Sequence, residues 1–401
     1  MGLTKQASPG AVIAIVRNDS VLFEKGYGMA NAEYNISNTP ESIYYICSLA
    51  KQFTAYSIIL LADQHKLKLD DDITLYLPWT KNFGEKITIR NLLHHTSGIR
   101  DDLDLLKISG VGRNGIISQD LALNILKQQH SLNFPPGTKY SYSNSNYILL
   151  AEIVKVVNKQ SFSQFTDSAI FKPLQMLHAH FYENPFEVIH NRAVSYNQTD
   201  SGKYQNSFQN VYTVGDGGLF MSMNDMTLWV MNYFNNKIGN AHDIETLNEK
   251  SILNNGEEAD GTNFKVKGWN TYQYNGGLNG YKTFITIFPD FKTGFIVFAN
   301  NGDDNIYNLY NPLTDLFIPL NRQISKDNHA DIGKIISDSN QLKKFCGDYI
   351  AGNNFHLHFN IDNGKLSFAQ GQFLLQQSSN TFLFAADTSI RFVFKKEMQN
   401  N

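Results

Sequence analysis

Two short apolar segments open the chain, and a polar turn separates them. Ala11–Val16 and Val21–Tyr27 are mostly apolar, and Arg17-Asn18-Asp19-Ser20 lies between them. Apolar runs of this length around a polar turn are typical of a β-hairpin. We therefore expect two strands at the start of the chain.

A long, mainly helical region follows, from Thr39 to about Asn263, and tight loops at Pro135-Pro136-Gly137 and Gly215–Gly218 interrupt it. The segments that we expect to be helical are Ile46–His65, Ile89–Leu93, Ile116–Gln129, Ser145–Asn158, Phe162–Ile170 and Met223–Phe234.

Strand patterns return after the helical region. The expected strands are Trp269–Tyr274, Tyr281–Phe288 and Gly294–Asn300, and a helix is expected over Ile306–Phe317. Strands from both chain ends around a helical block favour one antiparallel sheet with an inserted helical region. The expected fold class is α+β, because strands and helices do not alternate.

The last part of the chain has a different pattern. We expect a first domain over residues 1–320, a polar linker over 321–340 and a small antiparallel β-barrel or meander domain over 341–401. Asn363-Gly364 supplies a tight hairpin turn there. The expected strands are Phe355–Ile361, Lys365–Ala369, Phe373–Gln377, Thr381–Ala385 and Ile390–Phe394.

Composition excludes several classes of function. The net charge is −3, and no cluster of Lys and Arg forms a nucleic-acid surface. No apolar stretch approaches the roughly 18–20 residues of a membrane helix. The two cysteines, Cys47 and Cys346, make neither a metal-ligand spacing nor a disulfide framework. We expect no metal and no cofactor. No signal peptide is visible, so the protein is either cytoplasmic or its leader is missing.

A serine–lysine motif is the strongest candidate for chemistry. Ser48-Leu49-Ala50-Lys51 lies where the helix Ile46–His65 is expected to begin, and no other serine of the chain has a lysine three residues on. Residues at this spacing are neighbours on a helix, so Lys51 can reach the Ser48 hydroxyl. A serine needs a base to become a nucleophile, and a neutral lysine can be that base. A surface serine beside a solvated lysine is the alternative interpretation of this motif alone.

A second motif follows the Pro135–Gly137 loop and precedes an apolar helix. In Tyr142-Ser143-Asn144, the phenol of Tyr142 can pass a proton to a leaving group, and the amide of Asn144 can bind a substrate carbonyl or amide. We expect His94 and His95 to support the site from behind, at the start of a turn.

In this order, these motifs resemble those of the serine β-lactamase and penicillin-binding protein superfamily, in its class C-like branch. That branch includes D-Ala-D-Ala carboxypeptidases, D-amino-acid peptidases and family VIII esterases. The resemblance covers Pro9 to about Phe317 and includes the segments LLHHTSGIRD, FPPGTKYSYSNSNYILL, GDGGLFMSMNDM and NGGLNGYKTFITIFPD.

The resemblance implies a fold and a set of roles. The fold is the β-lactamase/transpeptidase-like fold, and Ser48 is the acylated nucleophile with Lys51 as its base. Tyr142 is the proton shuttle and Asn144 contacts the substrate. If a leader is missing, the resemblance favours a periplasmic or secreted protein.

The family's third motif, Lys-Thr-Gly or His-x-Gly, lies on a strand that borders the active site. Lys292-Thr293-Gly294 matches it literally but falls in an expected hairpin turn, so we expect Tyr274-Asn275-Gly276 in its place. The N–H of Gly277 would then join that of Ser48 as an oxyanion hole.

This substitution affects the expected substrate. Tyr274 replaces a cation, which favours neutral esters and amides over substrates with a carboxylate. Lys282 or Arg100 are the open alternatives for a cation from elsewhere in the chain.

We therefore expect a serine acyl hydrolase acting on small esters, amides or D-amino-acid peptides, with a small-molecule or short-peptide substrate. The alternatives are a β-lactamase or D-Ala-D-Ala carboxypeptidase, and a non-catalytic relative that binds peptidoglycan or a protein. The C-terminal β domain is a candidate for homo-oligomer formation.

Overall fold

The computed structural model describes residues 8–111, 115–259, 263–302, 306, 313–319, 339–351, 355–362, 364–369, 372–376, 381–384 and 387–393. It divides into two compact units. The first contains residues up to 264 and 271–314, and the second contains residues 265–270 and those from 315 onward.

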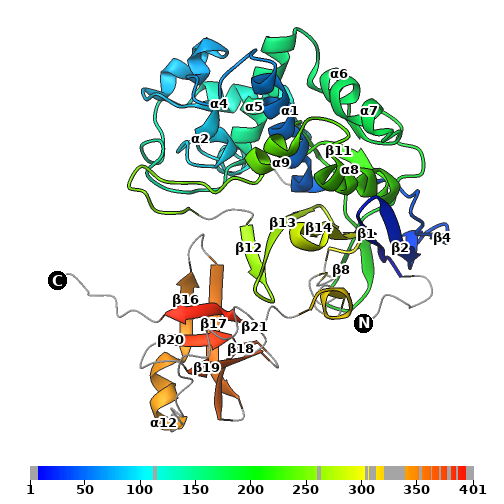
Figure 1. Cartoon of the computed structure of the whole chain (residues 1–401), viewed down its shortest axis with the longest axis vertical. Helices are drawn as coiled ribbons and strands as arrows, with labels where there is room; N and C mark the ends of the chain where they lie inside the picture. Colours follow the sequence, from blue (N-terminus) through cyan, green and yellow to red (C-terminus); the bar gives the residue numbers. More distant parts are fainter. Residues whose placement is uncertain are drawn as a thin grey trace. The chain divides into compact units, whose positions relative to one another are not determined.

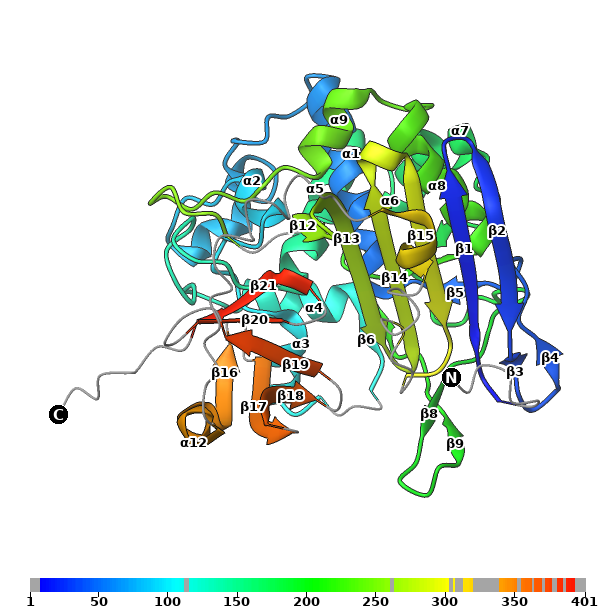
Figure 2. The same ribbon diagram turned by 60° about the horizontal axis from the view of Figure 1, so that its bottom comes forward.

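A six-stranded sheet forms the frame of the first unit, in the order β12-β13-β14-β15-β1-β2 (Figure 2). The pair β1–β15 is antiparallel and in register from Ala11↔Ala299 to Arg17↔Thr293, so the two ends of this unit meet in the middle of the sheet. The strands are β1 Ala11–Arg17, β2 Ser20–Tyr27, β12 Asn263–Val266, β13 Trp269–Leu278, β14 Tyr281–Phe288 and β15 Thr293–Ala299. The α+β prediction is confirmed, and only the short β12 was not expected.

The helical region lies between β2 and β12. Its helices are α1 Lys51–Asp63, α2 Ile89–Leu93, α3 Asp102–Ile108, α4 Gln119–Lys127, α5 Asn144–Asn158, α6 Phe162–Thr166, α7 Lys172–Leu174, α8 Met223–Asn235 and α9 Ala241–Leu247. Short 3₁₀ turns are η2 Cys47–Ala50, η3 Ile73–Leu75 and η4 Pro78–Phe83. Short strands complete it: β3 Met29–Asn31, β4 Ile36–Ser37, β5 Tyr44–Tyr45, β6 Ile117–Ser118, β7 His180–Phe181, β8 Tyr196–Gln198, β9 Tyr204–Asn206, β10 Val211–Tyr212 and β11 Leu219–Met221.

Three expected helices differ from the observed ones. The α-helix expected from Ile46 begins only at Lys51, after the 3₁₀ turn η2. The one expected from Ile116 begins at Gln119, because Ser118 caps it with its hydroxyl and Ile117–Ser118 pairs with β10. The one expected over 162–170 changes to a π-helical turn at Asp167–Phe171. The helix expected over 306–317 falls largely outside the described residues.

Helix α1 runs through the core of this unit. Its residues Phe53 and Tyr56 pack against Trp229 of α8, with ring centroids 4.6 and 5.1 Å apart. Helix α8 in turn contacts β1 and β15, and α1 and α8 lie on the same side of the sheet (Figure 1). Helix α1 is buried along most of its length, and its polar residues Gln52, Thr54 and Ser57 are buried with hydrogen-bond partners. The beginning of α1 is therefore held by core packing.

The second unit contains a six-stranded antiparallel sheet in which each strand pairs with the next along the chain, as in a meander. Its core side chains are Leu342, Phe345, Phe359, Leu366, Leu374 and Phe382. The elements are α12 Ser339–Leu342, η7 Lys343–Phe345, β16 Gly347–Ala351, β17 Phe355–Asp362, β18 Lys365–Ala369, β19 Gln372–Gln376, β20 Thr381–Phe384 and β21 Asp387–Val393. Strand β16 was not expected. The domain boundaries drawn from the sequence stay a prediction.

None of the helices in the described part of the chain combines the length and the apolar character that crossing a membrane requires.

Candidate active site

Ser48 lies in the 3₁₀ turn immediately before α1 and is partly exposed. The residue before it, Cys47, has a φ of 53°, in the left-handed region that costs a non-glycine residue energy. N–H groups in the first turn of a helix have no partner inside the helix, so the Ser48 N–H is available to a ligand.

Lys51 is the first residue of α1, and its side chain is buried. Its Nζ lies 3.3 Å from Ser48 Oγ, 2.9 Å from Asn144 Oδ1 and 2.7 Å from the carbonyl oxygen of Asp216. A neutral amine has two N–H bonds and one lone pair. If the two carbonyl oxygens accept both N–H bonds, the lone pair faces the Ser48 hydroxyl, which is the arrangement of a general base.

Tyr142 lies on the loop before α5, and its phenol donates a hydrogen bond of 2.9 Å to Ser48 Oγ. His95 holds both neighbours of this tyrosine. The Ser141 N–H donates to the His95 carbonyl at 2.9 Å, and the Ser143 N–H donates to His95 Nδ1 at 3.2 Å. The rings of His95 and Tyr142 lie 4.5 Å apart. One buried histidine thus fixes the position of the phenol.

His95 does this in its neutral form. Burial, assisted by the positive charge of Lys51, lowers the pKa of His95 to about 3. Because Nδ1 accepts from the Ser143 N–H, it carries no proton, and the other ring nitrogen, Nε2, is the protonated one. The expected supporting role fits this geometry.

Asn144 is oriented by Asp101. The Asp101 carboxylate accepts from the Asn144 backbone N–H at 2.7 Å and from its side-chain Nδ2 at 3.0 Å. Because the nitrogen of the amide faces Asp101, its oxygen faces Lys51. Asp101 also caps α3 through the N–H groups of Leu103 and Asp104.

Two further carboxyl groups, those of Asp102 and Asp216, are buried, and Asp216 lies next to Lys51. The Asp102 side chain is fully buried, and its Oδ2 has no hydrogen-bond partner among the described residues. Burial and the neighbouring Asp216 raise the pKa of Asp102 well above its ordinary value. Burial also raises the pKa of Asp216, and the charge of Lys51 opposes that shift. A buried carboxyl that stays protonated leaves less negative charge beside Lys51.

The segment expected as the third motif borders the serine turn. A Cβ on Gly276 would lie 2.8 Å from Cys47 Cβ and from the Ile46 carbonyl oxygen, so only glycine allows this close approach. Tyr274 donates from its hydroxyl to Asn248 Oδ1 at 2.6 Å, and Asn275 is exposed. The literal match Lys292-Thr293-Gly294 lies at the turn between β14 and β15, where Gly294 faces Val230 of α8.

The hairpin register sets the direction of the Gly277 N–H. Asn279 and Gly280 form a two-residue turn with positive φ at both positions, so Leu278 and Tyr281 flank it as a hydrogen-bonded pair. In an antiparallel ladder the next pair, Gly277↔Lys282, does not exchange hydrogen bonds. The Gly277 N–H therefore points away from β14. Strand β12 has four residues and a two-residue turn to β13, so it cannot reach this part of the edge.

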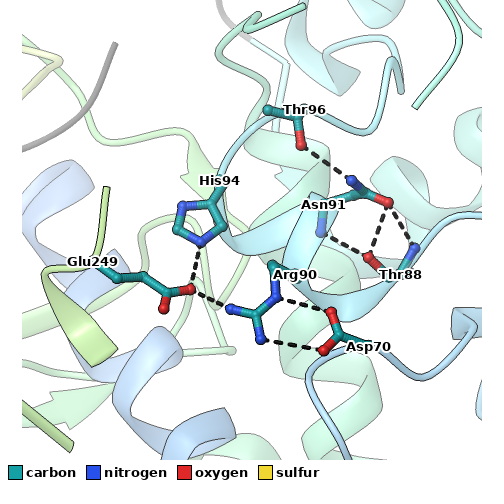
Figure 3. A network of polar contacts seen from close by, with 7 residues as sticks. All are labelled: Asp70, Thr88, Arg90, Asn91, His94, Thr96 and Glu249. Carbon is teal, nitrogen blue, oxygen red and sulfur yellow. Dashed lines mark hydrogen bonds and ion pairs between the residues drawn. The ribbon is translucent and has the colours of Figure 1, made fainter. Parts of the chain in front are cut away.

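A network of ion pairs surrounds Glu249 (Figure 3), which is the neighbour in sequence of Asn248, the residue that accepts the hydrogen bond of the Tyr274 hydroxyl. Glu249, next to Asn248, accepts from His94 Nε2 at 2.9 Å and pairs with Arg90, which also binds Asp70 at 2.8 Å. Burial opposes ionisation of Glu249, but the contacts with His94 and Arg90 hold its pKa below the ordinary value. The network thereby links α2 to the strand β13 through Asn248.

The structure thus brings Ser48, Lys51, Tyr142 and Asn144 into direct contact, and it places Gly276 against Cys47. Arg100 is engaged with Ser131 through both guanidinium nitrogens. Among the residues that the structure describes, no group of three or more His, Cys, Asp or Glu side chains is arranged to hold a metal ion.

We predict that His95→Asn weakens the acid sensitivity of folding. Below about pH 6.5 the unfolded wild type binds a proton at this position and the folded one does not until about pH 3, so the wild type loses stability as pH falls. Asparagine keeps an acceptor for Ser143 and tolerates the positive φ at this position. As pH falls from about 6.5 to about 3, the free energy of unfolding of His95→Asn, measured by urea titration, should decrease less than that of the wild type. The difference between the two slopes should be about 1.4 kcal/mol per pH unit. The same replacement at the exposed His242 should leave the slope unchanged, and an equal effect there would contradict the prediction.

We predict that Asp102→Asn stabilises the fold at neutral pH. A raised pKa in the folded state means that stability is lost as pH rises above about 4. The amide of the variant does not titrate. Above about pH 4, the free energy of unfolding of Asp102→Asn should therefore exceed that of the wild type by a further amount of about 1.4 kcal/mol per pH unit, until the pH passes the pKa of Asp102 in the folded state. Asp104→Asn, on the exposed side of α3, is the matched control. Urea titrations at pH 4 and pH 7 that show no gain for Asp102→Asn would refute the assignment.

Comparisons with known proteins identify the family and the fold of the chain. The sequence model of the β-lactamase family matches residues 2–313. Protein Flp of Staphylococcus aureus strain MRSA252 is 29% identical over 352 residues, which are 85% of this chain and 67% of that relative. A D-aminopeptidase of Gluconobacter oxydans is 29% identical over 221 residues, 55% of this chain and 41% of that relative. The octameric penicillin-binding protein homologue of Pyrococcus abyssi superposes with a TM-score of 0.70 at 23% identity and covers 95% of this chain and 90% of its own. The chain therefore belongs to the β-lactamase family of serine hydrolases.

Proposed function

We propose that the protein hydrolyses small esters or amides, D-amino-acid peptides among them, through a covalent acyl-enzyme on Ser48. The observation that carries the proposal is the position of Ser48 Oγ, within 3.3 Å of the Lys51 amine and 2.9 Å of the Tyr142 phenol. A surface serine beside a solvated lysine would show neither the buried amine nor the second contact.

In the acylation step, neutral Lys51 takes the Ser48 proton while Oγ attacks the substrate carbonyl carbon. The N–H groups of Ser48 and Gly277 stabilise the negative oxygen that forms, and each such donor contributes about 10²–10³ in turnover. Tyr142 then protonates the leaving alcohol or amine as its bond to the carbonyl carbon breaks. The Lys51 ammonium, 5.0 Å from the centroid of the Tyr142 ring, returns a proton to the phenolate.

In the second step a water molecule attacks the acyl-enzyme ester. The same basic groups accept a proton from the water, the bond between the acyl carbon and Ser48 Oγ breaks, and the serine regains its proton. The products are a carboxylic acid and the free enzyme.

The substrate class follows from the third segment and from one relative. Tyr274 occupies the place of a lysine or histidine, and its hydroxyl is engaged with Asn248, so no cation comes from that position. The relative from Gluconobacter oxydans is a D-aminopeptidase, which supports D-configured amides as substrates. We therefore favour esters and peptides over β-lactams.

Two alternatives remain in view. A β-lactamase or D-Ala-D-Ala carboxypeptidase would use the same nucleophile on penicillin-like or cell-wall substrates. A non-catalytic relative that binds peptidoglycan or a protein has no need for the contacts of Lys51 and Tyr142 with Ser48, which this chain retains. Self-association through the C-terminal β unit stays a prediction, because the octamer belongs to the relative from Pyrococcus abyssi.

Substitutions of the three side chains test the proposal. With a short p-nitrophenyl ester as substrate, Ser48→Ala should abolish measurable turnover, and Lys51→Met and Tyr142→Phe should each lower kcat by about 10²–10⁴, the range of general acid–base catalysis. Tyr140→Phe, on the same loop, is the matched control and should retain activity.

Full activity of Ser48→Ala would rule out this mechanism. Nitrocefin assayed in parallel separates the alternatives. Rapid nitrocefin turnover at micromolar KM would favour the β-lactamase, and the absence of turnover on every ester and peptide would favour the non-catalytic relative.

A further inference from the structure

The loss of the cation at Tyr274 raises the question of which other charged group lies next to the site. Arg100 is turned toward Ser131, and Lys51 is bound to the serine and two carbonyl oxygens. Lys282 is different, because it is the cross-strand partner of Gly277, the residue proposed to supply the second oxyanion donor.

The side chain of Lys282 lies over the backbone of Gly277. A Cβ placed on Gly277 would be 3.3 Å from Lys282 Cδ, 3.8 Å from its Cε and 3.6 Å from its Nζ. Partners that do not exchange hydrogen bonds are the closest pairs in an antiparallel ladder, which lets the lysine stem cross the neighbouring strand. The missing side chain at Gly277 gives it the room. The amine therefore lies over β13 itself, on the face of the sheet opposite to the one that Gly276 and Thr283 turn toward Cys47 and Ile46.

Within the described part of the chain, Lys282 Nζ has neither an ion pair nor a hydrogen bond. It is also only partly buried, so an anion can approach it. Its charge reaches the serine turn: burial raises the pKa of the Cys47 thiol, and the charges of Lys51 and Lys282 act against that shift. A cation without a partner at a ligand-binding edge is suited to pair with a charged ligand.

We propose that Lys282 binds a carboxylate of the substrate, so that the site accepts acyl compounds with a negative group close to the scissile carbonyl, such as peptides ending in a free D-amino acid. This proposal rests on the proposed function and refines it. The preference for neutral substrates that follows from Tyr274 is offset by a cation from the next strand.

Boronic acids test this without turnover, because they bind a nucleophilic serine reversibly and covalently. The pair consists of 3-carboxyphenylboronic acid and its neutral isostere, 3-carbamoylphenylboronic acid, with dissociation constants measured by calorimetry at low salt. The wild type should bind the carboxylate at least about 10-fold more tightly, as expected for a hydrogen bond to a charged group.

The variants are Lys282→Met, Lys282→Arg and, as the matched control, Lys292→Met at the far end of β14. The preference should fall to about 1 in Lys282→Met and persist in Lys282→Arg and Lys292→Met. A thermal unfolding measurement identifies any variant that fails to fold, and the arginine variant then decides the outcome.

The results separate the two proposals. Equal binding of both boronates by the wild type, or an unchanged preference in Lys282→Met, overturns the role of Lys282 and leaves the serine mechanism standing. If neither compound binds the wild type, or if both bind Ser48→Ala as tightly, the serine mechanism fails and the carboxylate site fails with it.

Discussion

The arrangement of the candidate active site depends on the hydrogen bonds that orient the Lys51 amine. Two carbonyl oxygens, from Asn144 at the start of α5 and from Asp216 in the loop before β11, lie within 2.9 Å of it. They leave one direction open, and Ser48 lies there. Three segments far apart in the sequence, those of Ser48 and Lys51, of Asn144 and of Asp216, therefore meet at a single nitrogen, and the burial of α1 fixes where that nitrogen is.

The surroundings of this amine are costly for the fold. A left-handed cysteine precedes the serine, a neutral histidine is buried beneath the tyrosine, and Asp102 carries a buried oxygen without a partner among the described residues. Each of these features opposes folding by an amount typical of strain or desolvation. The core around α1 and α8 offsets this cost, and aromatic side chains such as Phe53 and Trp229 form its centre. This concentration of unfavourable groups in one place is what is expected of a functional site.

The sequence allowed the sheet, the main helices and the Ser48–Lys51–Tyr142 constellation to be predicted, because apolar periodicity and motif order are local signals. Contacts between residues of different strands and loops leave no such local signal in the sequence. His95 fixes the position of Tyr142 by binding the residues on either side of it, Ser141 and Ser143. His95 and Ser143 are 48 positions apart, and no spacing in the sequence indicates their contact. The same holds for Asp101, which orients Asn144 from the start of another helix. Lys282 could be named as a cation but could not be placed until the register Gly277↔Lys282 was known.

The central claim is that Ser48 Oγ is a nucleophile activated by its neighbours, and covalent labelling tests it most directly. A fluorophosphonate probe should add one mass increment to the intact protein, and peptide mapping should place it on Ser48. The rate of labelling should fall by about 10² or more in Lys51→Met, because the base is then absent. Labelling at another residue, or equally fast labelling of Ser48 without the lysine, would contradict the account.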